Sequence, residues 1–260
     1  DGAMNEAVAV GIDAGSTTCK LVAVDAGGEA TATRLEPASP RLEEQAAQML
    51  GSLVAELGVA HGLPVVATGY GRRLVRGAAR QVTEITCHAR GVFRALGHGG
   101  TLVDLGGQDS KVIRIGGDGR PLDFTMNDKC AAGTGRFLEH TAGRLGVEVA
   151  ELGERALHSL TEEPITSTCT VFAESEIISL IARGADLDAI IRGLHRSLVG
   201  RIVAMVRSVG LDPPLILSGG VALNRGVQSM IGEATGEPVV LPAQPQLMGA
   251  YGAALIAADG

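Results

Sequence analysis

Residues 11–20 read Gly-Ile-Asp-Ala-Gly-Ser-Thr-Thr-Cys-Lys, and residues 101–111 read Thr-Leu-Val-Asp-Leu-Gly-Gly-Gln-Asp-Ser-Lys. In each stretch an aspartate, Asp13 or Asp104, ends an apolar run and is followed by glycines, small polar residues and a second apolar run. This order predicts a strand, a tight turn and a second strand. Such a turn offers backbone N–H groups to an anion, and glycine lets the backbone approach closely. Two of these turns, each with an aspartate, indicate two loops that close on a polyphosphate and its metal.

The rest of the chain repeats this plan, because each strand–turn–strand unit is followed by further strands and helices. The predicted elements are a hairpin at 7–25, a helix at 41–57, a strand at 65–69, a helix at 83–96, a hairpin at 101–115, helices at 133–145 and 171–183, a long helix capped by Asp186, a strand at 215–217, a glycine turn at 218–220, a helix from about 224 and a small-residue helix at 249–255. This internal duplication predicts an α/β fold of two similar lobes with a cleft between them.

The composition of the chain excludes several classes of protein. Its 260 residues fit one or two domains, and the formal charge of −7 (22 basic against 29 acidic residues) argues against nucleic acid as the main ligand. With no Trp, two Tyr and four Phe, a base-stacking platform is not expected either. No apolar stretch reaches transmembrane length, so we expect a cytoplasmic protein. The four cysteines form no CxxC pair, which argues against a zinc ribbon or a thioredoxin-like site.

Neither GxxxxGK[ST] nor GxGxxG occurs, so a P-loop or a Rossmann site is not supported. The turn at 13–20, the helix at 83–96, the turn at 104–111, the segment Leu-Ser-Gly-Gly-Val-Ala-Leu-Asn at 217–224 and the final Gly/Ala helix occur instead, in that order. This order resembles the phosphate 1, connect 1, phosphate 2, adenosine and connect 2 motifs of the actin, sugar kinase and heat-shock chaperone ATPase superfamily.

The superfamily resemblance implies two actin-like (ribonuclease H-like) lobes with an ATP cleft between them. On this interpretation lobe I spans residues 5–97 and receives the C-terminal helix at 245–260, and lobe II spans residues 98–244 and carries two of the cysteines, Cys130 and Cys169.

The wording of the motifs points to a narrower group. The segments 85–91, 104–111, 127–137 and 168–176, the last containing Cys169, resemble the 2-hydroxyacyl-CoA dehydratase activator and benzoyl-CoA reductase ATPase family. The resemblance covers nearly the whole chain. It implies a homodimer that holds one oxygen-sensitive 4Fe-4S cluster with two cysteines from each subunit. It also implies that ATP hydrolysis drives a low-potential electron from a ferredoxin or flavodoxin into a dehydratase or CoA-ester reductase partner.

The two turns supply the candidate catalytic residues. Asp13 and Asp104 are either strand-end caps or carboxylates that hold Mg²⁺ through water. Gln108 either orients the attacking water or packs as a buried amide. Lys20 is either a phosphate contact or a solvated strand lysine. The other residues expected to border the nucleotide are Gly15, Ser16, Thr17, Thr18, Gly106, Gly107, Gly133, Thr134, Gly219, Gly220, Val221, Asn224 and Gln246.

The four cysteines divide into two pairs. Cys19 and Cys87 fit the bland interpretation of a small buried hydrophobe. Cys130 and Cys169 each precede a predicted helix, whose free N–H groups favour a thiolate. From the residues alone, burial and ligation both remain open for this pair; the family resemblance implies that they ligate the 4Fe-4S cluster. Two ligands per chain cannot complete a four-cysteine site, and a two-fold dimer supplies the other two.

Two rival functions share these features. A small-molecule kinase of amino-sugar type would carry similar ATP motifs, and an actin-type filament protein would carry them without catalysis. No substrate-binding insertion and no dedicated sugar-hydroxyl base are visible, and the paired cysteines disfavour both rivals. The six histidines form no ligand spacing with one another, so we assign them no chemistry.

Overall fold

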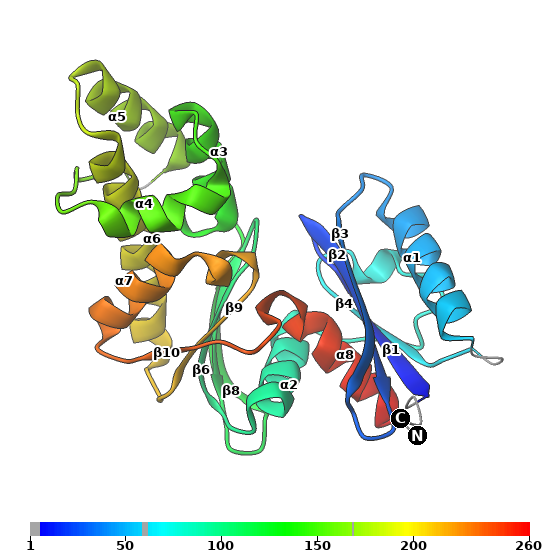
Figure 1. Ribbon diagram of the computed structural model, residues 1–260. Helices are drawn as coiled ribbons and strands as arrows, with labels where there is room; N and C mark the ends of the chain where they lie inside the picture. Colours follow the sequence, from blue (N-terminus) through cyan, green and yellow to red (C-terminus); the bar gives the residue numbers. More distant parts are fainter. Residues whose placement is uncertain (1–5, 59–61, 168) are drawn as a thin grey trace, which may run out of the picture. The chain divides into compact units, whose positions relative to one another are not determined.

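The computed structural model describes residues 6–58, 62–167 and 169–260 (Figure 1). The described residues form two compact units. Unit 1 takes its residues from Asp1–Gly99, Ile115–Pro121 and Gln246–Gly260, and unit 2 takes its residues from Gly100–Arg114 and Leu122–Pro245. In the described part of the chain, no helix combines the length and the apolar character needed to cross a membrane.

Unit 1 contains a five-stranded sheet in the order β3-β2-β1-β4-β5. Its central strand β1 runs antiparallel to β2 and parallel to β4, which makes the sheet mixed. Alternating small and branched apolar residues make β1 and β2 strands that are buried on both faces. The five strands are β1 (Ala7–Ala14), β2 (Thr18–Asp25), β3 (Ala30–Pro37), β4 (Val65–Thr68) and β5 (Arg80–Gln81).

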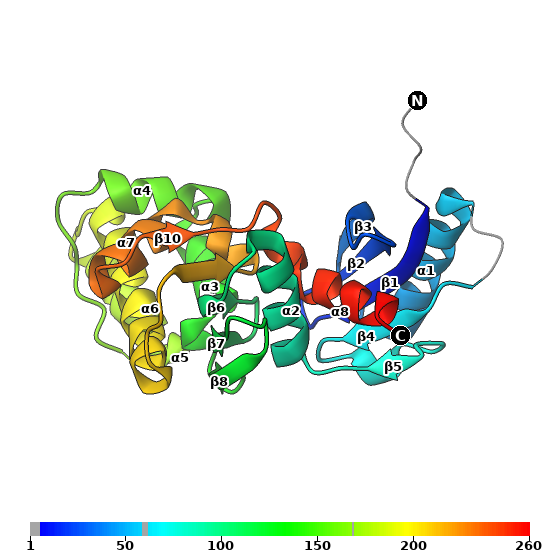
Figure 2. The ribbon, with the colours of Figure 1, turned by 90° about the horizontal axis from the view of Figure 1, so that it is seen from below.

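Helices cover the two faces of this sheet with different residues. On one face α1 (Leu42–Leu57) packs Met49 and Leu53 against β1 residues that include Ile12. On the other face α8 (Met248–Ala258) packs its alanines against the opposite side of the strands, with α2 (Glu84–Leu96) beside it (Figure 2). The sheet therefore lies between two apolar layers, and the turn that joins β1 to β2 lies at its edge.

Helix α8 approaches its neighbours too closely for side chains at three glycines. A Cβ atom at Gly11 of β1 would overlap the carbonyl oxygen of Ala250, and one at Gly91 of α2 would overlap that of Met248. A Cβ atom at Gly252 would overlap the carbonyl oxygen of Cys87. The small-residue helix predicted for close contact is therefore confirmed, and glycine is required here because only it lets backbones meet.

Unit 2 contains a second five-stranded sheet, in the order β10-β9-β6-β7-β8. The strand β6 runs parallel to β9, and β9 runs parallel to β10. The strands β6 and β7 are connected by the second predicted turn, whereas β8 forms the exposed edge. The five strands are β6 (Gly100–Leu105), β7 (Ser110–Ile115), β8 (Pro121–Asn127), β9 (Leu215–Ser218) and β10 (Val239–Val240).

The core of unit 2 is built on α6 (Leu187–Val209). The side chain of Asp186 caps this helix by accepting a hydrogen bond from the Ala189 N–H at 2.9 Å, as the sequence predicts. The predicted apolar stripe of α6 is confirmed, because all its members are buried. The other helices of unit 2 are α3 (Gly135–Leu145), α4 (Leu152–His158), α5 (Thr170–Ala182) and α7 (Arg225–Thr235).

One predicted helix boundary in unit 2 is wrong. The helix expected from Gly133 begins at Gly135, because residues 131–133 form a short 3₁₀ turn and Thr134 is extended, with φ −134° and ψ 173°. Cys130 therefore heads the 3₁₀ turn rather than the α-helix. Cys169, by contrast, lies directly at the N-cap of α5, as predicted.

Candidate active site and cluster cysteines

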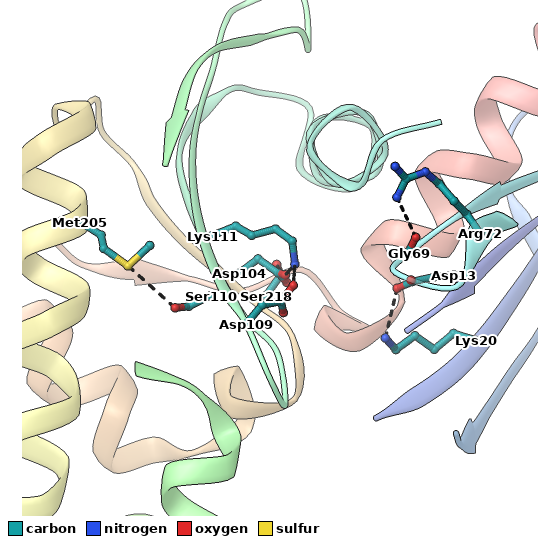
Figure 3. Close-up of polar contacts among 10 residues, drawn as sticks. All are labelled: Asp13, Lys20, Gly69, Arg72, Asp104, Asp109, Ser110, Lys111, Met205 and Ser218. Carbon is teal, nitrogen blue, oxygen red and sulfur yellow. Dashed lines mark hydrogen bonds and ion pairs between the residues drawn. The ribbon is translucent and has the colours of Figure 1, made fainter. Parts of the chain in front are cut away.

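The first turn, in unit 1, places Asp13 and Lys20 opposite each other. They are cross-strand partners in the β1–β2 ladder, and the Lys20 Nζ lies 3.1 Å from the Asp13 Oδ2 (Figure 3). The turn closes with a hydrogen bond from the Gly15 N–H to the Thr18 carbonyl at 3.1 Å. Lys20 is therefore neither a solvated strand lysine nor a distant one: it forms an ion pair with the buried aspartate of the turn.

Two polar atoms at this turn are buried without a protein partner. Among the described residues, the Asp13 Oδ1 and the Thr17 Oγ1 have no hydrogen-bond partner, although both atoms are inaccessible to water. Buried polar atoms of this kind are rare in a folded protein unless something else satisfies them. A hydrated cation and a phosphate oxygen would satisfy a carboxylate oxygen and a hydroxyl group, so the turn fits the predicted Mg²⁺–nucleotide ligand.

His88 of α2 also reaches this turn. A Cβ atom at Gly249 would lie 2.7 Å from the His88 Nε2 and 3.0 Å from the Asp13 Oδ2, so the imidazole and the carboxylate converge above that glycine. The imidazole is buried, with 6% of its residue surface exposed. No pattern in the sequence points to this histidine, because its partner Asp13 lies 75 positions earlier in the chain.

The second turn, in unit 2, holds Asp104 from two sides. The Ser218 hydroxyl, at the end of β9, donates to the Asp104 Oδ1 at 2.7 Å, and the Lys111 Nζ lies 3.4 Å from the Asp104 Oδ2 (Figure 3). The same ammonium group lies 2.7 Å from the Asp109 Oδ2. Ser218 begins the predicted adenosine motif, so this hydrogen bond joins that motif to the phosphate turn. Gln108, the candidate water-orienting residue, is exposed.

The glycines of the second turn accept hydrogen bonds from the start of α3. The Gly135 N–H donates to the Gly106 carbonyl at 2.9 Å, and the Arg136 N–H donates to the Gly107 carbonyl at 2.8 Å. A Cβ atom at Gly135 would come within 3.2 Å of Val221, which belongs to the adenosine motif. The start of α3 therefore contacts both predicted nucleotide motifs of unit 2.

The adenosine motif turns at Gly219, whose φ of +86° only glycine adopts readily. The motif ends at Asn224, whose Oδ1 caps α7 by accepting from the Val227 N–H at 3.0 Å. The amide of Asn224 also lies 3.0 Å from the Nε2 of His195, whose Nδ1 lies 2.8 Å from the Ile191 carbonyl. A carbonyl can only accept, so Nδ1 carries the proton and Nε2 accepts from Asn224. Because the Asn224 side chain points into the helix junction, the nucleoside contact predicted for it would come from its backbone.

The remaining predicted nucleotide residues lie close to these turns in sequence and differ in exposure. Ser16 and Gly220 are exposed, whereas Thr134 is fully buried, with its hydroxyl donating to the Ala131 carbonyl at 2.8 Å. The partly exposed positions are Gly15, Thr18, Gly107, Val221 and Gln246.

The four cysteines are free thiols that separate by burial. Cys19 and Cys87 are fully buried, and burial raises the pKa of Cys19 to about 11 and that of Cys87 to about 12. Both therefore stay protonated, which suits core packing and not metal ligation. Cys130 is exposed and Cys169 is half-buried. The two cysteines predicted as ligands are thus the two whose sulfur a second chain or a cluster can reach.

Polar side chains fix the backbone at both candidate ligands. Asn127, at the end of β8, accepts from the Cys130 N–H at 3.1 Å and donates to the Cys130 carbonyl at 2.7 Å. Glu176 of α5 accepts from the Thr166 N–H, at 3.1 Å, and from the Ser167 N–H, at 3.0 Å. Burial alone would raise the pKa of Glu176, but these hydrogen bonds outweigh it and lower the pKa. Thr168, which belongs to the motif at 168–176, lies outside the described residues.

Comparison with known proteins identifies the family. Residues 10–257 match the model of the BadF/BadG/BcrA/BcrD ATPase family. The chain belongs to that family. The resemblance inferred from the motifs is thereby confirmed.

Solved structures of similar sequence carry the same fold. The activator of the 2-hydroxyisocaproyl-CoA dehydratase from Clostridium difficile, with bound ADPNP, is 40% identical, with a TM-score of 0.88 over 96% of this chain and 94% of that one. Component A of the (R)-2-hydroxyglutaryl-CoA dehydratase from Acidaminococcus fermentans is 38% identical, with a TM-score of 0.90 over 96% and 97%. A component of the benzoyl-CoA reductase of Thauera aromatica is 31% identical over 95% of this chain and 92% of its own length.

A more distant structure shows the fold alone. A ROK family glucokinase from Streptomyces griseus matches with a TM-score of 0.58 at 17% identity, over 97% of this chain and 99% of that one. Together with the activator structures, it confirms the predicted actin-like α/β fold with two five-stranded sheets.

The stability of this ATPase-family chain should fall in mild acid because of His195. Burial lowers the pKa of His195 from its ordinary value of 6.5, and hydrogen bonds with Ile191 and Asn224 offset this only in part. Below pH 6.5 the unfolded chain therefore binds a proton that the folded chain does not, and stability is lost as the pH falls from 6.5 toward the lower folded pKa. One proton gives a slope of at most about 1.4 kcal/mol per pH unit.

Urea unfolding between pH 7.5 and 5 measures this slope. His195→Gln should flatten the decline, whereas His98→Gln, which changes an exposed histidine, should leave it unaltered. A wild-type curve that has the same slope as the His195→Gln curve contradicts the assignment.

Proposed function

We propose that this chain is an ATP-dependent activator that delivers a low-potential electron to a 2-hydroxyacyl-CoA dehydratase or a related CoA-ester reductase. Membership of the ATPase family supports ATP hydrolysis, and the names of the relatives support the class of partner. One observation carries the proposal: the glycine turn of Asp104 is hydrogen-bonded to α3, whose start lies only five residues after the accessible Cys130. The same unit thus holds a phosphate-binding turn and a thiol that suits a redox centre.

ATP with Mg²⁺ is the proposed substrate. Asp13 and Asp104 would hold the hydrated cation, and Lys20 would share its positive charge between Asp13 and the phosphates. The glycine turns would present N–H groups to the phosphate oxygens. Gln108, which is exposed at the second turn, would orient the attacking water. In this scheme the protein positions the reacting groups and stabilises charge rather than forming a covalent intermediate.

Cys130 and Cys169 are the proposed ligands of a 4Fe-4S cluster, which would supply one-electron transfer when bound. The donor set fits, because cluster irons are held by thiolates and these are the two accessible thiols. Two thiolates per chain require a second copy, so we propose a homodimer with two ligands from each subunit. The N-terminus of α5 directs free N–H groups toward Cys169 and stabilises its thiolate. A ferredoxin or flavodoxin is the proposed electron donor.

The amino-sugar kinase alternative is not favoured. The similarity to the glucokinase is at the level of the fold, with 17% identity, whereas the 40% identical structure is an activator. A shared fold does not imply a shared substrate.

An anaerobic coupled assay tests the proposal. The purified chain is mixed with a candidate dehydratase, reduced flavodoxin and Mg²⁺, and dehydration of the 2-hydroxyacyl-CoA ester is followed. We expect activity with ATP and none with ADP or a non-hydrolysable analogue, because hydrolysis must drive the transfer. The Cys130→Ala variant is the matched control that binds nucleotide and cannot activate. Phosphoryl transfer to a sugar panel, without activation of any candidate dehydratase, would support the kinase instead.

A further inference from the structure

Lys111 is a buried lysine that lies beside two carboxylates. Only 2% of its side chain is exposed, and its Nζ lies 2.7 Å from the Asp109 Oδ2 and 3.4 Å from the Asp104 Oδ2 (Figure 3). Asp109 and Lys111 lie outside the set of residues that the sequence patterns indicated as functional. A buried ammonium group is costly unless it is paired, so these contacts are what keeps the lysine charged inside the protein.

The first turn provides an internal comparison. Asp13 is followed by Lys20 after seven positions, and Asp104 is followed by Lys111 after seven positions. Each lysine forms an ion pair with its own aspartate. The turns differ five positions after the aspartate, where the first has Thr18 and the second has Asp109. Only Lys111 therefore has a second carboxylate, and its side chain is 2% exposed against 17% for Lys20.

The distances assign different roles to the two carboxylates around Lys111. The shorter contact, 2.7 Å, anchors the ammonium group to Asp109, and the longer one, 3.4 Å, extends from there to Asp104. The other Asp104 oxygen is bonded to the Ser218 hydroxyl at 2.7 Å. The Asp104 carboxylate is thus held at both oxygens, from β7 and from β9, which fixes its rotation about the Cβ–Cγ bond.

We propose that Lys111 is a positioning residue that, anchored by Asp109, orients the Asp104 carboxylate toward the hydrated Mg²⁺ of ATP. This deepens the proposed function and rests on it. The residues that orient a metal-binding group commonly change metal affinity or activity 10–100-fold when they are removed. Lys111 does so without touching the substrate, and it also leaves the turn with one net negative charge rather than two.

A charge-balanced double variant tests the role. Lys111→Met alone leaves two buried carboxylates unpaired, so it should lower the melting temperature. Lys111→Met combined with Asp109→Asn removes one charge of each sign and should restore most of that temperature. The readouts are the melting temperature, the affinity for a fluorescent ATP analogue in EDTA, the kcat for ATP and the Mg²⁺ concentration at half-maximal rate.

We expect the double variant to fold and to bind the analogue in EDTA as the wild type does. Its Mg²⁺ requirement should rise about 10-fold and its kcat should fall by about 10²-fold, because Asp104 has lost its orienting partner. A double variant that recovers wild-type kcat and Mg²⁺ dependence shows that Lys111 is only a counter-ion for folding, and overturns the proposal. Absence of Mg²⁺-dependent hydrolysis in the wild type would instead overturn the proposed function.

Two further variants complete the experiment. Arg155→Met with Asp188→Asn removes an ion pair of 2.6 Å elsewhere in unit 2 and should leave kcat unchanged. If the Lys111 double variant does not fold, Lys111→Arg decides, because it keeps the charge while its planar guanidinium cannot reproduce both contacts. We expect this variant to need more Mg²⁺, and an unchanged requirement overturns the proposal.

Discussion

Replacing Cys130 or Cys169 with alanine should abolish iron binding while the protein still folds and binds ATP. Wild-type protein purified without oxygen should contain about four irons per dimer, as expected for a four-thiolate cluster. The fold should survive because the contacts that hold both segments are made by the backbone: Asn127 bonds the Cys130 N–H and carbonyl, and the Cys169 carbonyl accepts from the Ala173 N–H. Neither substitution touches the glycine turns. Iron analysis, visible absorbance and analogue binding give the three readouts.

The matched control for these variants is Cys87→Ala, which removes a fully buried thiol of unit 1 and should keep all of the iron. Loss of iron should also weaken the dimer, since metal–ligand bonds are part of its binding free energy. Analytical ultracentrifugation of holo and iron-stripped protein measures that effect. A monomer that retains its iron, or single Cys130 and Cys169 variants with full iron, contradicts the shared-ligand proposal.

Asp104→Asn should slow Mg²⁺-dependent ATP hydrolysis by about 10²-fold or more, because one charged group in a phosphoryl-transfer site supplies several kcal/mol. Asparagine has almost the same shape and can still accept the bond from Ser218, so the turn should keep its structure. Lys111 would retain Asp109 as its charged partner. The loss should therefore appear in kcat and in the Mg²⁺ dependence, with iron content unchanged.

Asp123→Asn is the matched control for that substitution, because Asp123 is an exposed aspartate on the edge strand β8 of the same unit. Its turnover should equal that of the wild type. Wild-type turnover in Asp104→Asn as well would remove Asp104 from the proposed metal site.

The elements with strong periodicity can be predicted from the sequence. The apolar stripe of α6 and its Asp186 cap are confirmed because a long helix repeats its signal many times. The strands β3 and β8 escape prediction because their side chains are mostly exposed and their patterns carry little apolar alternation. The short helix α4 escapes it because its seven residues span only two turns.

The candidate site is predictable where a motif is continuous in sequence. Asp13 and Asp104 stand beside glycines within ten residues, so the turns can be recognised locally. His88 and His195 cannot, because each gains its meaning from a partner that only folding brings near, Asp13 in one case and Asn224 in the other. Lys111 shows a third limit: its spacing from Asp104 is visible in the sequence, but its burial between two carboxylates is not.

The hydrogen bonds from α3 to the second turn determine which way the peptide planes of that turn face. In a trans peptide the C=O and the following N–H point in opposite directions. Because the Gly106 and Gly107 carbonyls are drawn toward the N–H groups of Gly135 and Arg136, the N–H groups of Gly107 and Gln108 face away from α3. Any movement of α3 therefore tilts those amides, and an anion that they bind resists the tilt by the same free energy. The segment that carries Cys130 and the anion-binding amides are thus the two ends of one lever.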